Sequence, residues 1–473
     1  MRKYIIYSLI ITFTFFVSCD KELDLEPISE TGFNGAFDTA VDIENAVAGV
    51  YSGLQTIEQY GYHFSFFSEV RSDNTNLEDL TVNAGQFGNF ETFSLESANR
   101  RINETWVSMY QTIQQANLVL NRIDLVDDMS ESTKTKRKGE VRFIRALTYF
   151  NMVRFWSDVP LILTETEDAF ESFQHARTPS SQVYTQIEND LIQCITELPA
   201  TPDNIGRVTE GAAQALLGKV YLTQGKFSEA VSALQDVVGN YSLLPNFEDV
   251  FSTENSAESI FEIQYKSGGF GEGSSFSNNY APRSAGPELG INGTTLGDNI
   301  PTQELYDSFD VADLRRDVTV KSILDGRFYS GKLVSPVASQ GDSDKNFIVL
   351  RYADALLMLA EALNEVSYDP SGLAFTYLNQ IRQRAGLADL TNIHLPDQES
   401  FRMAVSNERR WELATENHRW FDLVRTGKAV EVMNTHFITE GEPYSMNENN
   451  TLFPIPQTQI DASSGLLTQN SGY

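Results

Sequence analysis

The sequence predicts a mainly α-helical protein, in which helical hairpins form a superhelix beside a loop-rich half with a few short strands. Three observations predict this fold class. Ten segments place apolar residues three or four positions apart, which is the spacing of one helix face. Glycines follow several of these segments, where a left-handed helix cap favours glycine. Two long stretches lack that periodicity and are rich in Gly, Ser, Asn and Phe.

The ten periodic segments are expected to be helices. In one of them, VYTQIENDLIQCITEL, Cys194 shares the apolar face, so we expect a buried core residue there rather than a reactive thiol. The alternating segment Ser259–Tyr265 is expected to be a strand. The helical segments are Val41–Ile57, Asn103–Leu125, Thr133–Phe155, Ser181–Glu197, Glu210–Gln224, Ser228–Val238, Ala353–Val366, Gly372–Arg384, Glu399–Ala414 and Asn417–Thr426.

One helical pair has the pattern of a tetratricopeptide repeat. In the segment Ala215–Leu234, Gly218 occupies the small-residue position that lets two helices approach, and Tyr221 fills the space beside it. Looser copies combine a small and a large residue at Ala146 and Tyr149 and at Ala360 and Leu363. One clear repeat with degenerate copies predicts a partial superhelix rather than a regular array.

The first 35 residues have the pattern of an exported, lipidated N-terminus. Two basic residues precede an apolar run from Tyr4 to Val17, which is shorter than the roughly 20 residues of a membrane-spanning helix. The run ends in Val-Ser-Cys, which resembles the lipobox of a bacterial lipoprotein, so Cys19 is the expected lipidation site. An ordinary secretory signal with an incidental cysteine is the alternative. We expect a signal peptide at 1–18, a lipidated tether at 19–35 and a single domain at 36–473.

Charge restricts the possible partners. The chain has 35 basic and 65 acidic residues, a formal net charge of −30, which argues against nucleic acid because Lys and Arg carry phosphate affinity. The acidic residues directly after Cys19 resemble the surface-export tag of Bacteroidetes lipoproteins, although a solvated tether would look the same. We therefore expect a location at the outer membrane, facing the cell exterior, with membrane contact through the lipid anchor only.

Catalytic and cofactor motifs are missing from the sequence. The five histidines do not pair at metal-ligand spacing, and no GxSxG motif occurs. The glycine-rich run Gly268–Gly273 lacks the GK[ST] ending of a phosphate-binding loop. We therefore expect no enzymatic activity, no cofactor and no metal ligands.

The segment Asn407–Gly427 has the densest charge pattern, NERRWELATENHRWFDLVRTG. Its acidic and basic residues at helical spacing admit a catalytic interpretation. The favoured interpretation is structural: Arg and Glu side chains pair within a helical hairpin while Trp420 packs against it.

The same segment resembles the C-terminal signature of the SusD/RagB family of Bacteroidetes outer-membrane lipoproteins. The final block Leu452–Tyr473 agrees, with its PIP segment and its QNSGY ending, in which Ser471 replaces the family's usual proline. Further matching blocks are Trp106–Ile123, Glu140–Leu163 and Leu350–Glu365. The match therefore runs from the lipobox to the last residue.

The resemblance implies a helical fold with four tetratricopeptide-like helix pairs and a loop-rich half. It also implies a non-enzymatic protein that captures an oligo- or polysaccharide at the cell surface. Such a protein delivers the glycan to a partner barrel, a TonB-dependent SusC-like transporter. A peptide-capturing relative, or a lid or scaffold of the same complex that binds nothing itself, is the alternative.

Two irregular stretches, Tyr60–Arg101 and Ser267–Ile300, are the candidate ligand-binding regions. A sugar ring needs an aromatic plate for its C–H face and polar groups for its hydroxyl rim. Several of the phenylalanines also suit a core, and the four tryptophans fall in helical blocks and look structural. The candidate residues are Arg71, Asp73, Asn74, Phe87, Phe93 and Asn99 in the first stretch, and Phe270, Phe276, Asn278, Tyr280 and Arg283 in the second.

Overall fold

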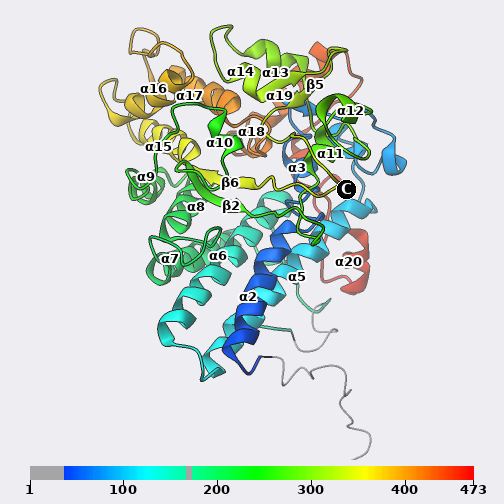
Figure 1. Ribbon diagram of the computed structural model, residues 1–473, viewed down its shortest axis with the longest axis vertical. Helices are drawn as coiled ribbons and strands as arrows, with labels where there is room; N and C mark the ends of the chain where they lie inside the picture. The colour runs from blue at the N-terminus through cyan, green and yellow to red at the C-terminus, as the bar shows by residue number, and fades with distance from the viewer. Residues whose placement is uncertain (1–36, 167–172) are drawn as a thin grey trace, which may run out of the picture.

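The computed structural model describes residues 37–166 and 173–473. The expected signal peptide, Cys19 and the tether lie outside these residues. Long helices form one part of the molecule, and short helices and loops gather in the other (Figure 1). Among the described residues, no helix combines the length and the apolar character that crossing a membrane requires.

The ten predicted helices are all present, and their ends lie within a few residues of the expected ones. A further long helix, α19 (Ala429–Glu440), is not predicted by the sequence analysis. The ten are α2 (Ala40–Gln55), α5 (Arg100–Arg122), α6 (Glu131–Trp156), α7 (Ser180–Glu197), α8 (Glu210–Thr223), α9 (Phe227–Gln235), α15 (Tyr352–Val366), α16 (Leu373–Arg384), α17 (Gln398–Leu413) and α18 (Arg419–Arg425).

Side-chain caps explain where several helices begin. Thr39 starts α2 with a capping box, in which its hydroxyl accepts the amide hydrogen of Asp42 and the Asp42 carboxylate accepts that of Thr39. Thr209 caps α8 with a single bond, in which its hydroxyl accepts the amide hydrogen of Ala212. Gly225 follows α8 with a φ of +71°, the left-handed conformation that glycine adopts without a steric penalty.

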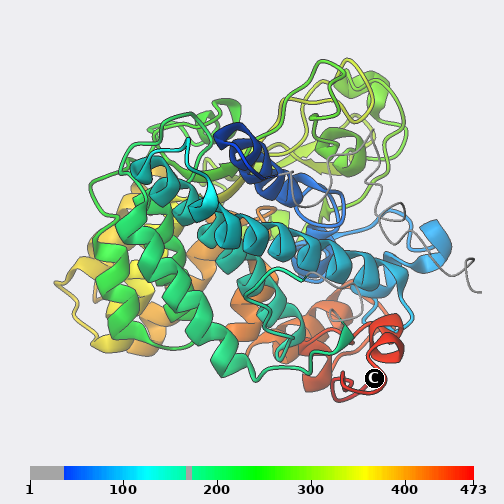
Figure 2. The same ribbon diagram turned by 90° about the horizontal axis from the view of Figure 1, so that it is seen from below.

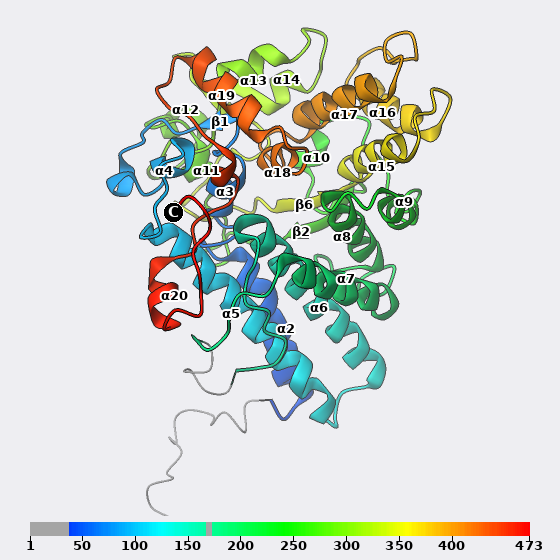
Figure 3. The same cartoon turned by 180° about the vertical axis from the view of Figure 1, so that it is seen from behind.

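Consecutive long helices pack as hairpins, with α2 against α5, α6 against α7, α8 against α9, and α15 against α16 (Figures 1 and 3). Gly218 lies where α8 meets α9. A Cβ atom added there would lie 2.4 Å from Cγ of the buried Leu234. The predicted small-residue position of the repeat is therefore confirmed, and so is the mainly helical, tetratricopeptide-like fold class.

Within residues 37–166 and 173–473, the strands are short and form three antiparallel pairs. The predicted strand is present as β2 (Ser259–Ile263) and pairs with β6 (Phe347–Arg351). The others are β1 (Thr75–Asn76) with β3 (Ile300–Pro301), and β4 (Val320–Ser322) with β5 (Phe328–Ser330). The short helices among them are α3 (Phe64–Ser68), α4 (Gly88–Glu91), α10 (Asp249–Ser252), α11 (Phe276–Tyr280), α12 (Gly286–Leu289), α13 (Gln303–Ser308), α14 (Arg316–Thr319) and α20 (Gln457–Ala462).

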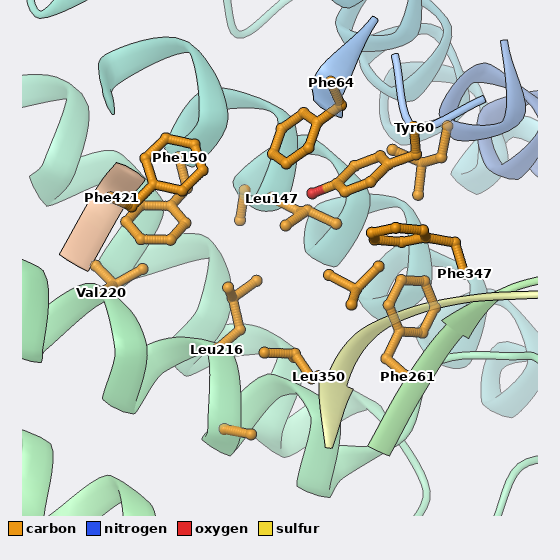
Figure 4. Packing of buried hydrophobic residues seen from close by; sticks show 14 of the residues in the cluster. Tyr60, Phe64, Leu147, Phe150, Leu216, Val220, Phe261, Phe347, Leu350 and Phe421 are labelled. Carbon is orange, nitrogen blue, oxygen red and sulfur yellow. The ribbon is translucent and has the colours of Figure 1, made fainter. Parts of the chain in front are cut away.

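One large hydrophobic core joins the helical part to the loop-rich part. Figure 4 shows Phe64 and Phe347, from the loop side, facing Leu216 and Phe150 of the long helices. Figure 2 shows the helices of the N-terminal half side by side, with the light green and yellow loops beyond them. Cys194 is fully buried, and burial raises the pKa of its thiol well above the usual value. This burial agrees with the expected core role.

The charged segment Asn407–Gly427 forms a buried ion-pair network. Glu412 contacts Arg315, Arg351 and Arg384, and all four side chains are at most 4% exposed. Trp420 is fully buried. This burial supports the structural interpretation of the segment, but the pairing differs from the expected one. Within the segment Asp422 pairs with Arg409 and Arg425, whereas Glu412 pairs with arginines from outside the hairpin.

Candidate functional site

In the first candidate stretch, the predicted polar residues have internal partners. Arg71 is fully buried and donates to the backbone oxygens of Phe90 at 3.0 Å and Asn450 at 2.6 Å. Burial lowers the pKa of its guanidinium to about 10. Asp73 pairs with Arg419 at 2.8 Å and Asn74 donates to Glu69 at 2.9 Å. Asp73 therefore links this stretch to α18, while Arg71 and Asn74 bond to other loop segments.

The aromatic candidates of that stretch are part of the core. Phe87 is 5% exposed and stacks on Phe66 with ring centroids 4.2 Å apart. Phe93 is 7% exposed and lies under the Arg71 guanidinium, 4.0 Å from its ring centroid. Asn99 is the N-cap of α5 and accepts the amide hydrogen of Arg101. In this conformation each of them presents little or no surface to a ligand.

At the centre of the second candidate stretch, the predicted site residues are also buried and have internal partners. Phe276 and Tyr280 are buried and stacked, with ring centroids 5.8 Å apart. Asn278 donates to the backbone oxygens of Asn292 and Thr294 and accepts the amide hydrogen of Gly341. Its side chain thus joins three loop segments.

Phe270 and Arg283 are the two predicted site residues with substantial exposed surface. Phe270 is 76% exposed at the tip of the loop that contains Gly268 and Gly271. The side chain of Arg283 is 38% exposed and pairs with Asp79. These two residues retain the exposure that contact with a large soluble ligand requires.

A hollow of about 1330 Å³ opens beside the Phe270 loop. The loop of residues 267–273 forms one wall and the segment 335–345 forms another. The carboxylate of Asp342 accepts the amide hydrogens of Gly268 and Gly269, and that of Asp344 accepts the Ser267 amide hydrogen. The sequence analysis does not single out residues 335–345, although their polar, glycine-containing run SPVASQGDSDK has the composition of a loop.

A second hollow, of about 700 Å³, lies between α5 and the C-terminal part of the chain. Figure 3 shows α20 beside α5. Trp106 and Tyr110 form an aromatic wall with ring centroids 5.2 Å apart, and Phe173, 41% exposed, lines the same space. Amide side chains of Gln111 and three other glutamines also line it: Gln114, Gln115 and Gln459. The sequence pattern does not reveal this hollow, because Trp106 and Tyr110 lie in a helical segment, where aromatic residues are expected to be part of the core.

An acidic group titrates near Arg283. Asp298 is 6% exposed and accepts a hydrogen bond from the Tyr62 hydroxyl. Burial raises the pKa of Asp298 to about 6, against the opposing hydrogen bond from Tyr62 and the positive charge of Arg283. Arg283 also donates its amide hydrogen to Glu78 at 2.6 Å, and Arg327 pairs with the same carboxylate at 2.9 Å.

Two family models match the chain. One, described as the SusD family, matches residues 325–473, and the other, described as starch-binding associating with outer membrane, matches residues 23–222. The N-terminal and C-terminal parts of the chain are thus both SusD-like. Among SusD-like relatives, SusD-like protein P2 of Formosa agariphila is 28% identical over the full length of both chains. Starch-binding protein SusD of Bacteroides thetaiotaomicron is 23% identical over 50% of this chain and 45% of its own.

Solved structures of SusD-like proteins share the fold. A laminarin binding SusD-like protein superposes with a TM-score of 0.79 at 29% identity, covering 92% of this chain and all of the other. Surface glycan-binding protein A from Bacteroides thetaiotaomicron has the same TM-score and coverage at 23% identity. As a SusD-like protein, the chain is a non-catalytic protein. The chemistry of its site is therefore that of binding.

Proposed function

We propose that this chain is a cell-surface, lipid-anchored protein that binds a glycan and delivers it to a TonB-dependent, SusC-like outer-membrane transporter. The observation that carries the binding role is the exposed ring of Phe270, which lies in the same loop as Gly269 and Gly271, two residues that line the 1330 Å³ hollow. An exposed aromatic ring gives a sugar its apolar platform, and the hydroxyl, amide and carboxylate groups of the walls suit its hydroxyls. The family and its laminarin binding relative support the glycan class.

The charge of the hollow favours a neutral glycan. Asp342, Asp344 and Glu254 all line it, and Lys345 is the lysine that lines it with them. The whole chain carries a formal net charge of −30. A polymer of uronic acids or sulfated sugars would bring like charges together, which costs free energy in a binding site. We therefore expect a neutral polysaccharide, with laminarin as the first probe.

Affinity electrophoresis of residues 25–473 through gels that each contain one polysaccharide tests the binding role. We expect retardation by a neutral glucan and none by an acidic polysaccharide. Phe270→Ala should weaken binding roughly 5–30-fold, because a lost aromatic platform is worth about 1–2 kcal/mol. Phe173→Ala is the matched control, since it removes an exposed phenylalanine from the other hollow. Loss of binding in Phe173→Ala alone would move the site to α5.

The alternative is a peptide-capturing protein or a lid that binds nothing by itself. The tetratricopeptide-like hairpins of the chain motivate this alternative, because such helices commonly present protein-binding surfaces. Co-purification with the transporter without retardation by any polysaccharide would favour this alternative over glycan capture.

The lipid anchor at Cys19 is part of the proposal and lies outside the described residues. Cys19→Ala should give a chain that takes up no labelled fatty acid and escapes labelling at the cell surface. Two or more acyl chains are needed for firm attachment, since each buried CH₂ contributes only about 0.8 kcal/mol. Normal surface labelling of the variant would contradict the anchor.

A further inference from the structure

Three potential metal ligands meet between α13 and α19. Glu304 belongs to α13, while His436 and Glu440 lie four residues apart on α19 and therefore share one face of it. A ligand atom from each of the three side chains lies within 4.8 Å of the other two. Nδ1 of His436 is 2.6 Å from Oε2 of Glu304. Small side-chain movements would bring all three atoms to the distances of a coordination sphere.

The charges around the three side chains are compatible with a bound cation. Arg410 contacts Glu304 at 3.1 Å, but the guanidinium is also paired with Asp73 at 2.9 Å. Glu440 is the last residue of α19, where the negative end of the helix dipole disfavours a carboxylate and favours a cation. The exposed position of Glu440 keeps the cluster open to water.

We propose that Glu304, His436 and Glu440 form a binding site for a divalent transition-metal ion, Zn²⁺ foremost, that joins the end of α19 to α13. The donor set selects the class of ion. An imidazole with two carboxylates suits Zn²⁺ and its neighbours, whereas Ca²⁺ takes six to eight oxygen ligands. Three protein ligands also match the open zinc sites in which water completes the coordination.

The pairing explains why a search along the sequence passes over this site. The spacing between histidines does not reveal it, because the partner of His436 on α19 is the glutamate Glu440. The third ligand, Glu304, is 132 residues away and is brought near only by the packing of α13 on α19. The site is separate from the hollow beside Phe270, because none of its residues lines that hollow.

Isothermal titration of the tag-free, chelator-treated chain with ZnCl₂ tests the site. We expect one Zn²⁺ per chain and a melting temperature that rises with Zn²⁺ concentration, because an ion that binds only the folded state stabilises it. Glu440→Gln should weaken Zn²⁺ binding at least tenfold, and since Glu440 is exposed, the variant should fold normally. His436→Ala should abolish binding. His394→Ala, which removes an exposed histidine outside the cluster, should leave it unchanged.

Each contrary result overturns the proposal in its own way. Absence of stoichiometric Zn²⁺ binding by the unmodified chain refutes the site. Binding that survives either Glu440→Gln or His436→Ala refutes the assignment of ligands. Equal affinity for Ca²⁺ and Zn²⁺ refutes the role of the imidazole.

Discussion

Replacing Glu412 by Gln tests whether the buried ion-pair network stabilises the fold. The amide has the size of the carboxylate, so packing is preserved and the negative charge is lost. Glu412 Oε1 faces Arg351 and Arg384, and Oε2 accepts from Arg315 at 3.0 Å. The side chains of Glu412 and of its three arginine partners are buried.

The expected loss of unfolding free energy depends on the carboxylates that remain beside each arginine. Removing one member of a buried charge pair typically costs 3–5 kcal/mol, because the other charge stays buried. Here each arginine keeps a second carboxylate: Arg315 keeps Asp313 at 2.7 Å, and Arg351 and Arg384 keep Glu258 at 2.9 Å. The glutamine oxygen also still accepts a hydrogen bond. We therefore expect the lower end, about 3 kcal/mol, which is a large share of a typical folding free energy of roughly 5–15 kcal/mol.

The stabilisation by the Glu412 carboxylate depends on pH with a defined sign. Burial alone would raise the pKa of Glu412, but Arg384, Arg351 and Arg315 together hold it well below the usual range. A depressed folded-state pKa adds stability that is complete above the unfolded-state pKa of about 4.3 and is lost as pH falls below it. The difference in unfolding free energy between the wild type and Glu412→Gln should therefore be largest near pH 7 and shrink below pH 4.

Urea denaturation followed by circular dichroism measures that difference. The slope of free energy against urea should stay unchanged if only stability is affected. Glu431→Gln is the matched control, because it breaks an exposed pair with Lys428 that is worth little. A cost below about 1 kcal/mol for Glu412→Gln at pH 7 would show that the network is not a source of stability and would refute the reasoning.

Two further predictions concern packing and titration. Gly218→Leu should lower the unfolding free energy by roughly 1–3 kcal/mol or more, since a Cβ there already meets Leu234 at 2.4 Å. Gly49→Ala, where the nearest atom is 3.9 Å away, should instead stabilise α2 by about 0.5–1 kcal/mol, and an unchanged midpoint for Gly218→Leu would contradict the repeat packing. Asp298→Asn should be more stable than the wild type at pH 8, by at most about 3 kcal/mol, and equal to it near pH 4, as measured by urea denaturation across that range. The sign follows because a raised folded-state pKa makes ionisation of Asp298 costly, so wild-type stability falls as pH rises from about 4 through 6; a pH-independent difference between the two proteins would contradict it.

The sequence by itself determined the helical framework. Apolar residues at helical spacing predicted ten helices, and Gly218 predicted the close approach of α8 and α9, because both signals depend on neighbours within one or two turns. The resemblance in the segment Asn407–Gly427 pointed to the family, but the arginine partners of Glu412 lie outside that segment and its spacing could not predict them.

Only the tertiary structure decided which loop residues face solvent. In a segment without periodicity, a phenylalanine can serve equally as core or as platform, so Phe87 and Phe276 were indistinguishable from Phe270 along the chain. Their exposure depends on segments far away in sequence, such as the run 335–345 that faces the Phe270 loop. The same reason applies to Glu304 and His436, whose proximity is created by the packing of α13 on α19. Local periodicity records contacts within a helix, whereas a surface site arises from contacts between elements that the sequence separates.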